Sequence, residues 1–195
     1  MPDNKKYITF GSPSIGREEI NAVTKCMKSG WIGTGPLVKK FENNFAYYSK
    51  SNYAIAVGSC TAALHLSLNS ISLNKGDEVI VPAMTFCSTV NSIIHSGYKP
   101  VLADVNFNTM NIDAEEIEKK ISKKTRALVI VHFAGRPCDM DKIIRIVKKY
   151  NLILIEDCAH AIESSHNGKK CGTFGMYGCF SFYVTKNLVT AEGGM

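Results

Sequence analysis

Apolar, β-branched runs alternate with helical patterns along most of the chain, and this alternation limits the possible folds more than any other feature. Strands separated by helices form βαβ units, in which the strands run parallel and helices cover both faces of the sheet. We therefore expect an α/β fold, a three-layer α/β/α domain around a mostly parallel sheet. The expected strands are 78–81, 101–105, 128–131, 152–155 and 179–183, and the expected helices are 61–73, 88–96 and two that begin at Asp113, with a capping box completed by Glu116, and at Asp139. Helical spacing also recurs earlier, at Ile20, Val23 and Met27 and at Leu37, Phe41 and Phe45.

The composition is that of an ordinary globular protein, with 45% hydrophobic and 21% charged residues, which excludes collagen, coiled coil and general disorder. No apolar run approaches the ~18 residues of a membrane span, and the N-terminus leads into no secretory signal. The net charge of +6 comes from scattered lysine pairs without interleaved aromatics, which indicates solvated helix faces rather than a nucleic-acid surface. We expect a cytoplasmic protein with no nucleic-acid or membrane partner.

The seven cysteines do not suggest a disulfide framework, because their number is odd, none forms a C-x-x-C pair and nothing indicates export. We expect reduced and mostly buried thiols. A zinc site drawn from Cys158, His160, His166 and Cys171 is disfavoured, because their spacing matches no usual set of ligands. The patterns for nicotinamide dinucleotides and P-loop nucleotide hydrolysis are absent as well.

The chemistry-bearing residues follow the expected strands. In parallel sheets, ligands bind beyond the carboxyl ends of the strands. Asp157 follows one buried strand, and an acidic side chain there is costly to bury without a partner, although a helix cap is the alternative. Lys186 lies beside an apolar aromatic run, where a lysine can serve as a Schiff-base nucleophile, although an exposed loop lysine is the alternative.

Two further features complete the pattern. Ser59, Cys60 and Thr61 open a helix whose free N–H groups suit a phosphate, although close helix packing explains small residues equally well. Phe86 follows a strand and could stack on a flat ring, with core packing as the alternative. An amine, an acid, a phosphate cradle and a planar neighbour together match one cofactor, pyridoxal 5'-phosphate (PLP).

The sequence also resembles the DegT/DnrJ/EryC1/StrS sugar aminotransferases, a family of fold-type I PLP enzymes. The matching stretches are 13–19, 29–36, 59–64, 81–86, 156–161 and 181–195, in this order along the chain. The resemblance implies that Lys186 holds the cofactor as a Schiff base and moves the proton, that Asp157 pairs with the pyridine nitrogen, and that His160 lies near the ring. It implies that Phe86 stacks on the ring, that Ser59, Cys60, Thr61 and Ser181 hold the phosphate, and that Phe10, Gly30, Trp31, Ile32, Gly33 and Thr34 border the substrate.

The function implied by the resemblance is amino transfer, with glutamate as donor and a nucleotide-linked keto sugar as acceptor, in amino-sugar or polysaccharide biosynthesis by a homodimer. A related sugar dehydratase is one alternative, which Lys186 disfavours because such dehydratases have histidine there. A non-catalytic relic or binding module is another.

Two departures from the family pattern are visible. Cys60 occupies a position where glycine is commoner. Family members also continue for a comparable length beyond the position of Met195. The resemblance therefore implies that residues 1–195 form a single, incomplete PLP-binding large domain without the C-terminal small domain, and that this chain alone is inactive.

Overall fold

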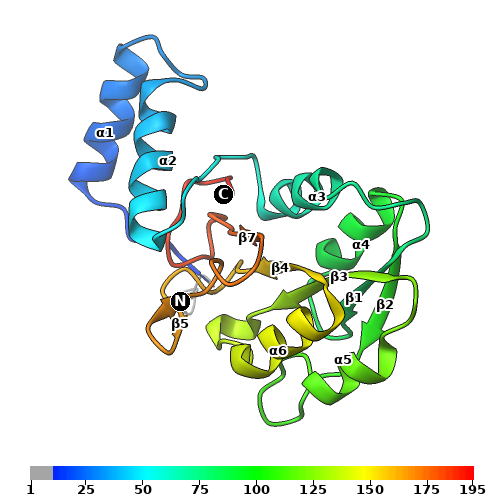
Figure 1. The fold of residues 1–195 in the computed structure, drawn as a ribbon. Helices are drawn as coiled ribbons and strands as arrows, with labels where there is room; N and C mark the ends of the chain where they lie inside the picture. The colour runs from blue at the N-terminus through cyan, green and yellow to red at the C-terminus, as the bar shows by residue number, and fades with distance from the viewer. Residues whose placement is uncertain (1–10) are drawn as a thin grey trace, which may run out of the picture.

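The computed structural model describes residues 11–195, and its centre is a parallel sheet of five strands (Figure 1). The order of the strands across the sheet is β2-β1-β3-β4-β7, and every neighbouring pair is parallel. The strands are β1 (Glu78–Pro82), β2 (Lys99–Ala103), β3 (Thr125–Val131), β4 (Ile153–Asp157) and β7 (Tyr177–Cys179). The central strands β1, β3 and β4 are apolar on both faces, as parallel strands covered by two layers must be.

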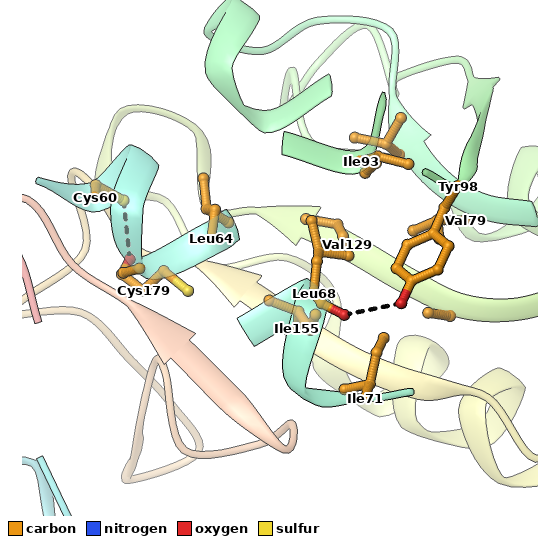
Figure 2. Packing of buried hydrophobic residues seen from close by; sticks show 13 residues of the cluster. Cys60, Leu64, Leu68, Ile71, Val79, Ile93, Tyr98, Val129, Ile155 and Cys179 are labelled. Atoms are coloured by element: carbon orange, nitrogen blue, oxygen red, sulfur yellow. Dashed lines mark hydrogen bonds between the residues drawn. The ribbon is translucent and has the colours of Figure 1, made fainter. Parts of the chain in front are cut away.

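Two helical layers cover the sheet, so the expected three-layer architecture is confirmed. Successive side chains of a strand point to opposite faces. Val79, Val129 and Ile155 accordingly pack with α3 (Cys60–Ser70) and α4 (Cys87–His95), the layer shown in Figure 2. Ile80 and Leu128 face the other way, against α5 (Ala114–Lys120) and α6 (Met140–Tyr150). A 3-10 turn, η1 (Phe133–Gly135), follows β3, and a small antiparallel hairpin, β5 (Ser165–His166) and β6 (Lys169–Lys170), follows β4.

A helical arm, defined here as residues 17–49, projects from this α/β body (residues 60–195) in Figure 1. It consists of α1 (Arg17–Lys28) and α2 (Pro36–Ser49). Among the described residues of the arm, α1 buries no side chain and α2 buries only Phe45 and Ser49 near its end. Phe45 packs edge-on against Phe180 and Phe182 of the body, with ring centroids 4.9 and 5.7 Å away. The arm is therefore joined to the body at its base.

Two expected elements differ from the structure. The last strand was expected at 179–183 but is Tyr177–Cys179, because the backbone of Phe180 and Phe182 bonds with residues 193–195 instead. The strand expected at 101–105 is Lys99–Ala103. The other strand and helix positions agree to within a few residues.

Of the two helix starts predicted from aspartates, one cap is confirmed and one capping box is wrong. Asp139 caps α6 by accepting a hydrogen bond from the Lys142 N–H, as expected. Asp113 caps α5 through the Glu115 N–H, but its own N–H donates to the Asp104 carbonyl, so no capping box with Glu116 forms. Among residues 11–195, no helix combines the length and the apolar character that crossing a membrane requires.

Candidate active site

A cavity of about 710 Å³ lies at the carboxyl ends of β1, β3 and β4. This is where a parallel sheet offers a ligand site, because the loops that leave its strands diverge there. The start of α3 and the segment around Lys186 complete its wall. The predicted residues that the structure brings together on this wall are Ser59, Cys60, Thr61, Phe86, Asp157, His160, Ser181 and Lys186.

Asp157 is the last residue of β4, and it is buried although it borders the cavity. Burial raises the pKa of its carboxyl group, while hydrogen bonds from the Ala159 N–H (3.1 Å, to Oδ1) and the Thr89 hydroxyl (2.8 Å, to Oδ2) counteract the rise. No helix begins at Asp157 in the described chain, so the alternative of a helix cap is wrong. The carboxylate remains available to a partner in the cavity.

Lys186 and His160 meet on the cavity wall. The ammonium Nζ of Lys186 lies 2.8 Å from Nε2 of His160. Partial burial lowers the pKa of the imidazole, and the positive charge of Lys186 lowers it further, so His160 is neutral at neutral pH and accepts the hydrogen bond. Lys186 is half-buried against the cavity rather than an exposed loop lysine.

The start of α3 presents hydrogen-bond donors to the same cavity. The first N–H groups of a helix have no intrahelical partner, and the helix dipole favours an anion beside them. Ser59 caps α3 by accepting from the Ala62 N–H, and the Ser181 hydroxyl oxygen accepts from the Tyr183 N–H, so each hydroxyl keeps its proton free to donate. Gly194 packs against this turn, since a Cβ there would clash with the Ser59 carbonyl carbon. This donor set suits a phosphate group.

Cys60 contributes differently from its neighbours. Its buried thiol faces the Asp157 carboxylate (3.8 Å) and the Cys179 carbonyl (3.5 Å), and Figure 2 shows the second contact. Burial raises the pKa of the thiol far above its usual range, so it stays protonated. What Cys60 can offer a phosphate is therefore its backbone N–H, a donor that does not depend on the side chain.

Phe86 precedes α4 and is 74% exposed, although it is large and apolar. The alternative of core packing is therefore wrong. Its ring lines the cavity next to Met84 and Thr85, in a place where it can cover a flat ligand.

The predicted substrate loop, residues 30–34, does not line this cavity in the single chain described here. Trp31, Ile32 and Gly33 lie on the helical arm, around a separate surface depression of about 420 Å³. The loop is closed by a hydrogen bond from the Trp31 indole N–H to the Thr34 carbonyl. The predicted residue Phe10 lies outside the described residues. The roles of this loop and of Phe10 stay predictions.

Sequence reasoning missed the polar network behind the site. Nδ1 of His132 accepts from the Cys138 N–H, so Nε2 carries the proton and donates to Glu156 at 3.0 Å. Glu156 also accepts from the N–H groups of Gly172, Phe174 and Gly175. The buried pair therefore fixes the loop that leads into β7. The available signal was the position of Glu156 in an apolar strand, since a buried carboxylate must find donors.

The structure does not gather the four residues of the disfavoured zinc site. Among residues 11–195, the group of close metal-binding types is instead His132, Glu156 and Cys158. Both Glu156 oxygens already accept hydrogen bonds from the protein, which leaves this cluster a packed network. All seven cysteines lie in the described chain and are free thiols, as expected.

Several curated proteins are similar to the chain. It is 50% identical to an uncharacterized protein of Methanocaldococcus jannaschii, over 94% of this chain and 47% of that protein. It is 46% identical to the spore coat polysaccharide biosynthesis protein SpsC of Bacillus subtilis (97% and 49%) and 43% identical to GDP-perosamine synthase of Escherichia coli O157:H7 (97% and 52%). The chain thus spans about half the length of the curated relatives it matches.

Solved structures share the fold. Spr1654 of Streptococcus pneumoniae, assigned as a sugar aminotransferase and solved in its PLP form, matches 96% of this chain and 52% of its own, with a TM-score of 0.92 and 35% identity. The dehydratase ColD, solved with bound GDP-perosamine, matches 95% and 50%, with a TM-score of 0.91 and 31% identity. Residues 13–195 match a single family description along nearly the whole chain. The chain belongs to the DegT/DnrJ/EryC1/StrS aminotransferase family.

Proposed function

We propose that the protein is a PLP-dependent aminotransferase that transfers an amino group from glutamate to a nucleotide-linked keto sugar. The observation that carries this proposal is that an amine, Lys186, and a buried carboxylate, Asp157, border one cavity together with the start of α3. The amine would hold the cofactor's aldehyde carbon, the carboxylate would pair with the pyridine nitrogen, and the helix start would bind the phosphate. Few other cofactors require all three.

The residues fit the cofactor in chemistry and arrangement. Bound PLP supplies an aldehyde that reacts with amines and a ring that withdraws electrons from the bond to be broken. Asp157 would hold a proton on the pyridine nitrogen through a charge-assisted hydrogen bond. Ser59, Ser181 and the first N–H groups of α3 would bind the phosphate. Phe86, exposed on the cavity wall, would cover one face of the ring.

Lys186 has two tasks in this proposal. Its Nζ would hold the cofactor covalently and, once the donor amino acid has displaced it, would carry a proton to and from the reacting carbon. Both tasks need an unprotonated amine. His160 positions this nitrogen, because its neutral Nε2 accepts a hydrogen bond from Nζ at 2.8 Å.

The relatives support a sugar substrate. Their printed names include a GDP-perosamine synthase and a spore coat polysaccharide biosynthesis protein. The second candidate is a sugar dehydratase, which the similarity to ColD favours. The lysine at position 186 argues for transamination, given the histidine that the family resemblance implies for dehydratases.

The cofactor is tested by trapping it. The protein is incubated with PLP, reduced with borohydride and digested, and the modified peptide is found by mass spectrometry. We expect the label on Lys186 and its loss in Lys186→Ala, while Lys75→Ala, which removes an exposed lysine after α3, keeps it. A label on another lysine in the wild type would refute the assignment.

The reaction is tested with glutamate and GDP-4-keto-6-deoxymannose on protein extended to the length of its curated relatives, because the family resemblance implies that residues 1–195 alone are inactive. Transamination consumes one glutamate for each amino sugar formed, whereas dehydration releases the sugar oxygen as water. An amino sugar supports the proposal, and a deoxy keto product supports the dehydratase. Trapped PLP without either product, in protein shown to be folded, would contradict this choice of substrate while leaving the cofactor site intact.

A further inference from the structure

Two threonine hydroxyls connect the buried Asp157 to the cavity wall. The Thr89 hydroxyl, in the first turn of α4, lies 2.8 Å from Oδ2 of Asp157. The Thr85 hydroxyl lies 2.8 Å from that of Thr89, and Thr85 lines the cavity. Thr89 is 0% exposed, so its hydroxyl has no water to bond with and depends on these two partners.

The direction of the hydrogen bonds in the series Thr85–Thr89–Asp157 follows from the carboxylate at its end. A carboxylate has no proton to give, so Thr89 donates its single proton to Asp157. The oxygen of Thr89 is then left as an acceptor, and Thr85 donates to it. Thr85 has no second proton, so its oxygen can only accept from a group in the cavity. If Asp157 becomes protonated at Oδ2, it donates to Thr89, and the hydrogen bonds of this series reverse their direction.

We infer that Thr89 is a positioning residue that keeps Asp157 ionised and fixes its rotation, and that Thr85 orients Thr89 while presenting an acceptor oxygen to the cavity. The inference deepens the proposed function and rests on it, since an ionised Asp157 is what a protonated pyridine ring requires. Both carboxylate oxygens are then held, Oδ1 by the Ala159 N–H and Oδ2 by Thr89. The remaining lone pairs are available to the ligand.

The need for such a residue follows from burial. Asp157 is one of the buried acids among residues 11–195, and burial raises the pKa of its carboxyl group. The Thr89 hydroxyl lowers that pKa by stabilising the charged form. The other titratable groups that face Asp157 are Cys60 of α3, His132 after β3, Cys158 and His160 after β4, Cys179 of β7 and Lys186.

The decisive variant is Thr89→Val, which replaces the hydroxyl with a methyl group of similar size. The pKa of Asp157 is read from the ¹³C shift of its carboxyl carbon in cofactor-free protein, and the PLP affinity is measured separately. We expect a higher pKa and a PLP Kd raised about tenfold, the effect of losing one hydrogen bond to a charged group. Thr89→Ser, which keeps the hydroxyl, should restore both values.

Two further variants guard against a purely structural effect. Ser92→Ala removes another buried hydroxyl of α4, one that donates to the Ser88 carbonyl and not to Asp157, and it should change neither value. Thr85→Val, at the less buried end of the series, should raise the pKa of Asp157 by less than Thr89→Val does. If Thr89→Val does not fold, the pKa of Asp157 in Thr85→Val tests the inference instead.

The two measurements test the inference and the proposed function separately. An unchanged pKa of Asp157 in the threonine variants, or an equal rise in Ser92→Ala, would overturn the inference. If wild-type protein binds no PLP, the proposed function fails. The pKa measured without cofactor would still decide whether Thr89 holds Asp157 ionised.

Discussion

The helical arm and the α/β body contain the same sequence signal with opposite results. In the body, apolar residues at helical spacing, such as Ile143 and Ile146 of α6, are buried against the sheet. In the arm, Ile20, Val23 and Met27 have the same spacing but are more than half exposed. Periodicity therefore predicts a helix, whereas burial depends on whether another layer lies against that helix. Among residues 11–195, no such layer lies against the arm.

The contrast extends to how each region is held. The body is stabilised by two clusters of buried side chains, one on each face of a continuous sheet. The arm is held at its base by the Phe45 aromatic cluster and by Tyr48, whose hydroxyl donates to Glu163 and accepts from Lys170. Four predictions test this difference, in order of decreasing expected effect.

Cysteine labelling should show the largest difference between the two regions. Only a thiolate reacts, and burial raises the pKa of Cys179 in the body to about 12, so few thiolates exist at pH 8. Cys26 of the arm is half-buried and Cys87 of the body is exposed. With a thiol reagent and mass spectrometry, we expect Cys179 to react roughly 10³-fold more slowly than Cys87, because it must wait for unfolding.

Cys26 is the informative site in that experiment. It should react at a rate close to that of Cys87. Protection of Cys26 would mean that the arm is covered in solution, as the predicted homodimer allows, and rapid labelling of Cys179 would contradict a stable body.

Variants of the two regions, made in protein extended to the length of the curated relatives, should also separate chemistry from substrate selection. Asp157→Asn in the body should slow the glutamate half-reaction about 10²–10³-fold, because the ring loses its charged partner. Trp31→Ala in the arm should leave that half-reaction unchanged and raise only the KM for the sugar. Stopped-flow absorbance and steady-state kinetics measure the two effects. A half-reaction at the wild-type rate in Asp157→Asn would show that this carboxylate is not the partner of the ring.

A pair of leucines compares packing directly. Leu64 of α3 is 0% exposed and Leu37 of α2 is 60% exposed. Leu64→Ala should lower the free energy of unfolding by about 2–5 kcal/mol, because it leaves a cavity. Leu37→Ala should change it by less than about 0.5 kcal/mol. Urea denaturation measures both. Equal costs would show that Leu37 is buried in the native assembly.

The smallest expected effect concerns the base of the arm. Tyr48→Phe removes the hydroxyl shared by Glu163 and Lys170 and should cost about 1 kcal/mol or less, since the site is partly solvated. Tyr47→Phe, at an 88% exposed neighbour, is the matched control and should cost nothing measurable. A large loss for Tyr48→Phe would mean that the arm stabilises the body more than its few contacts indicate.

The layered fold and the residues lining the cavity could be predicted because both leave local patterns. A run such as 152–155 is apolar whatever surrounds it, and Asp157 or Lys186 stands out beside such a run. The last strand was misplaced because residues 180–182 pair with residues 193–195, and no local pattern records that choice. Thr89 was missed for a similar reason. A threonine in an apolar helix is unremarkable until the fold brings it to Asp157.

The backbone pairing of Gly194 with Val57 and Ser181 has a consequence for the order of folding. Gly194 lies beside Ser59 and so completes the helix start that is proposed to bind phosphate, yet most of the described chain separates the two residues. Contacts of such high contact order form slowly, because a long loop must close before they add any stability. During synthesis, strands β1, β2 and β3 can pair while Gly194 is still within the ribosome. The proposed phosphate-binding site at the start of α3 is therefore expected to be among the last parts of the molecule to fold.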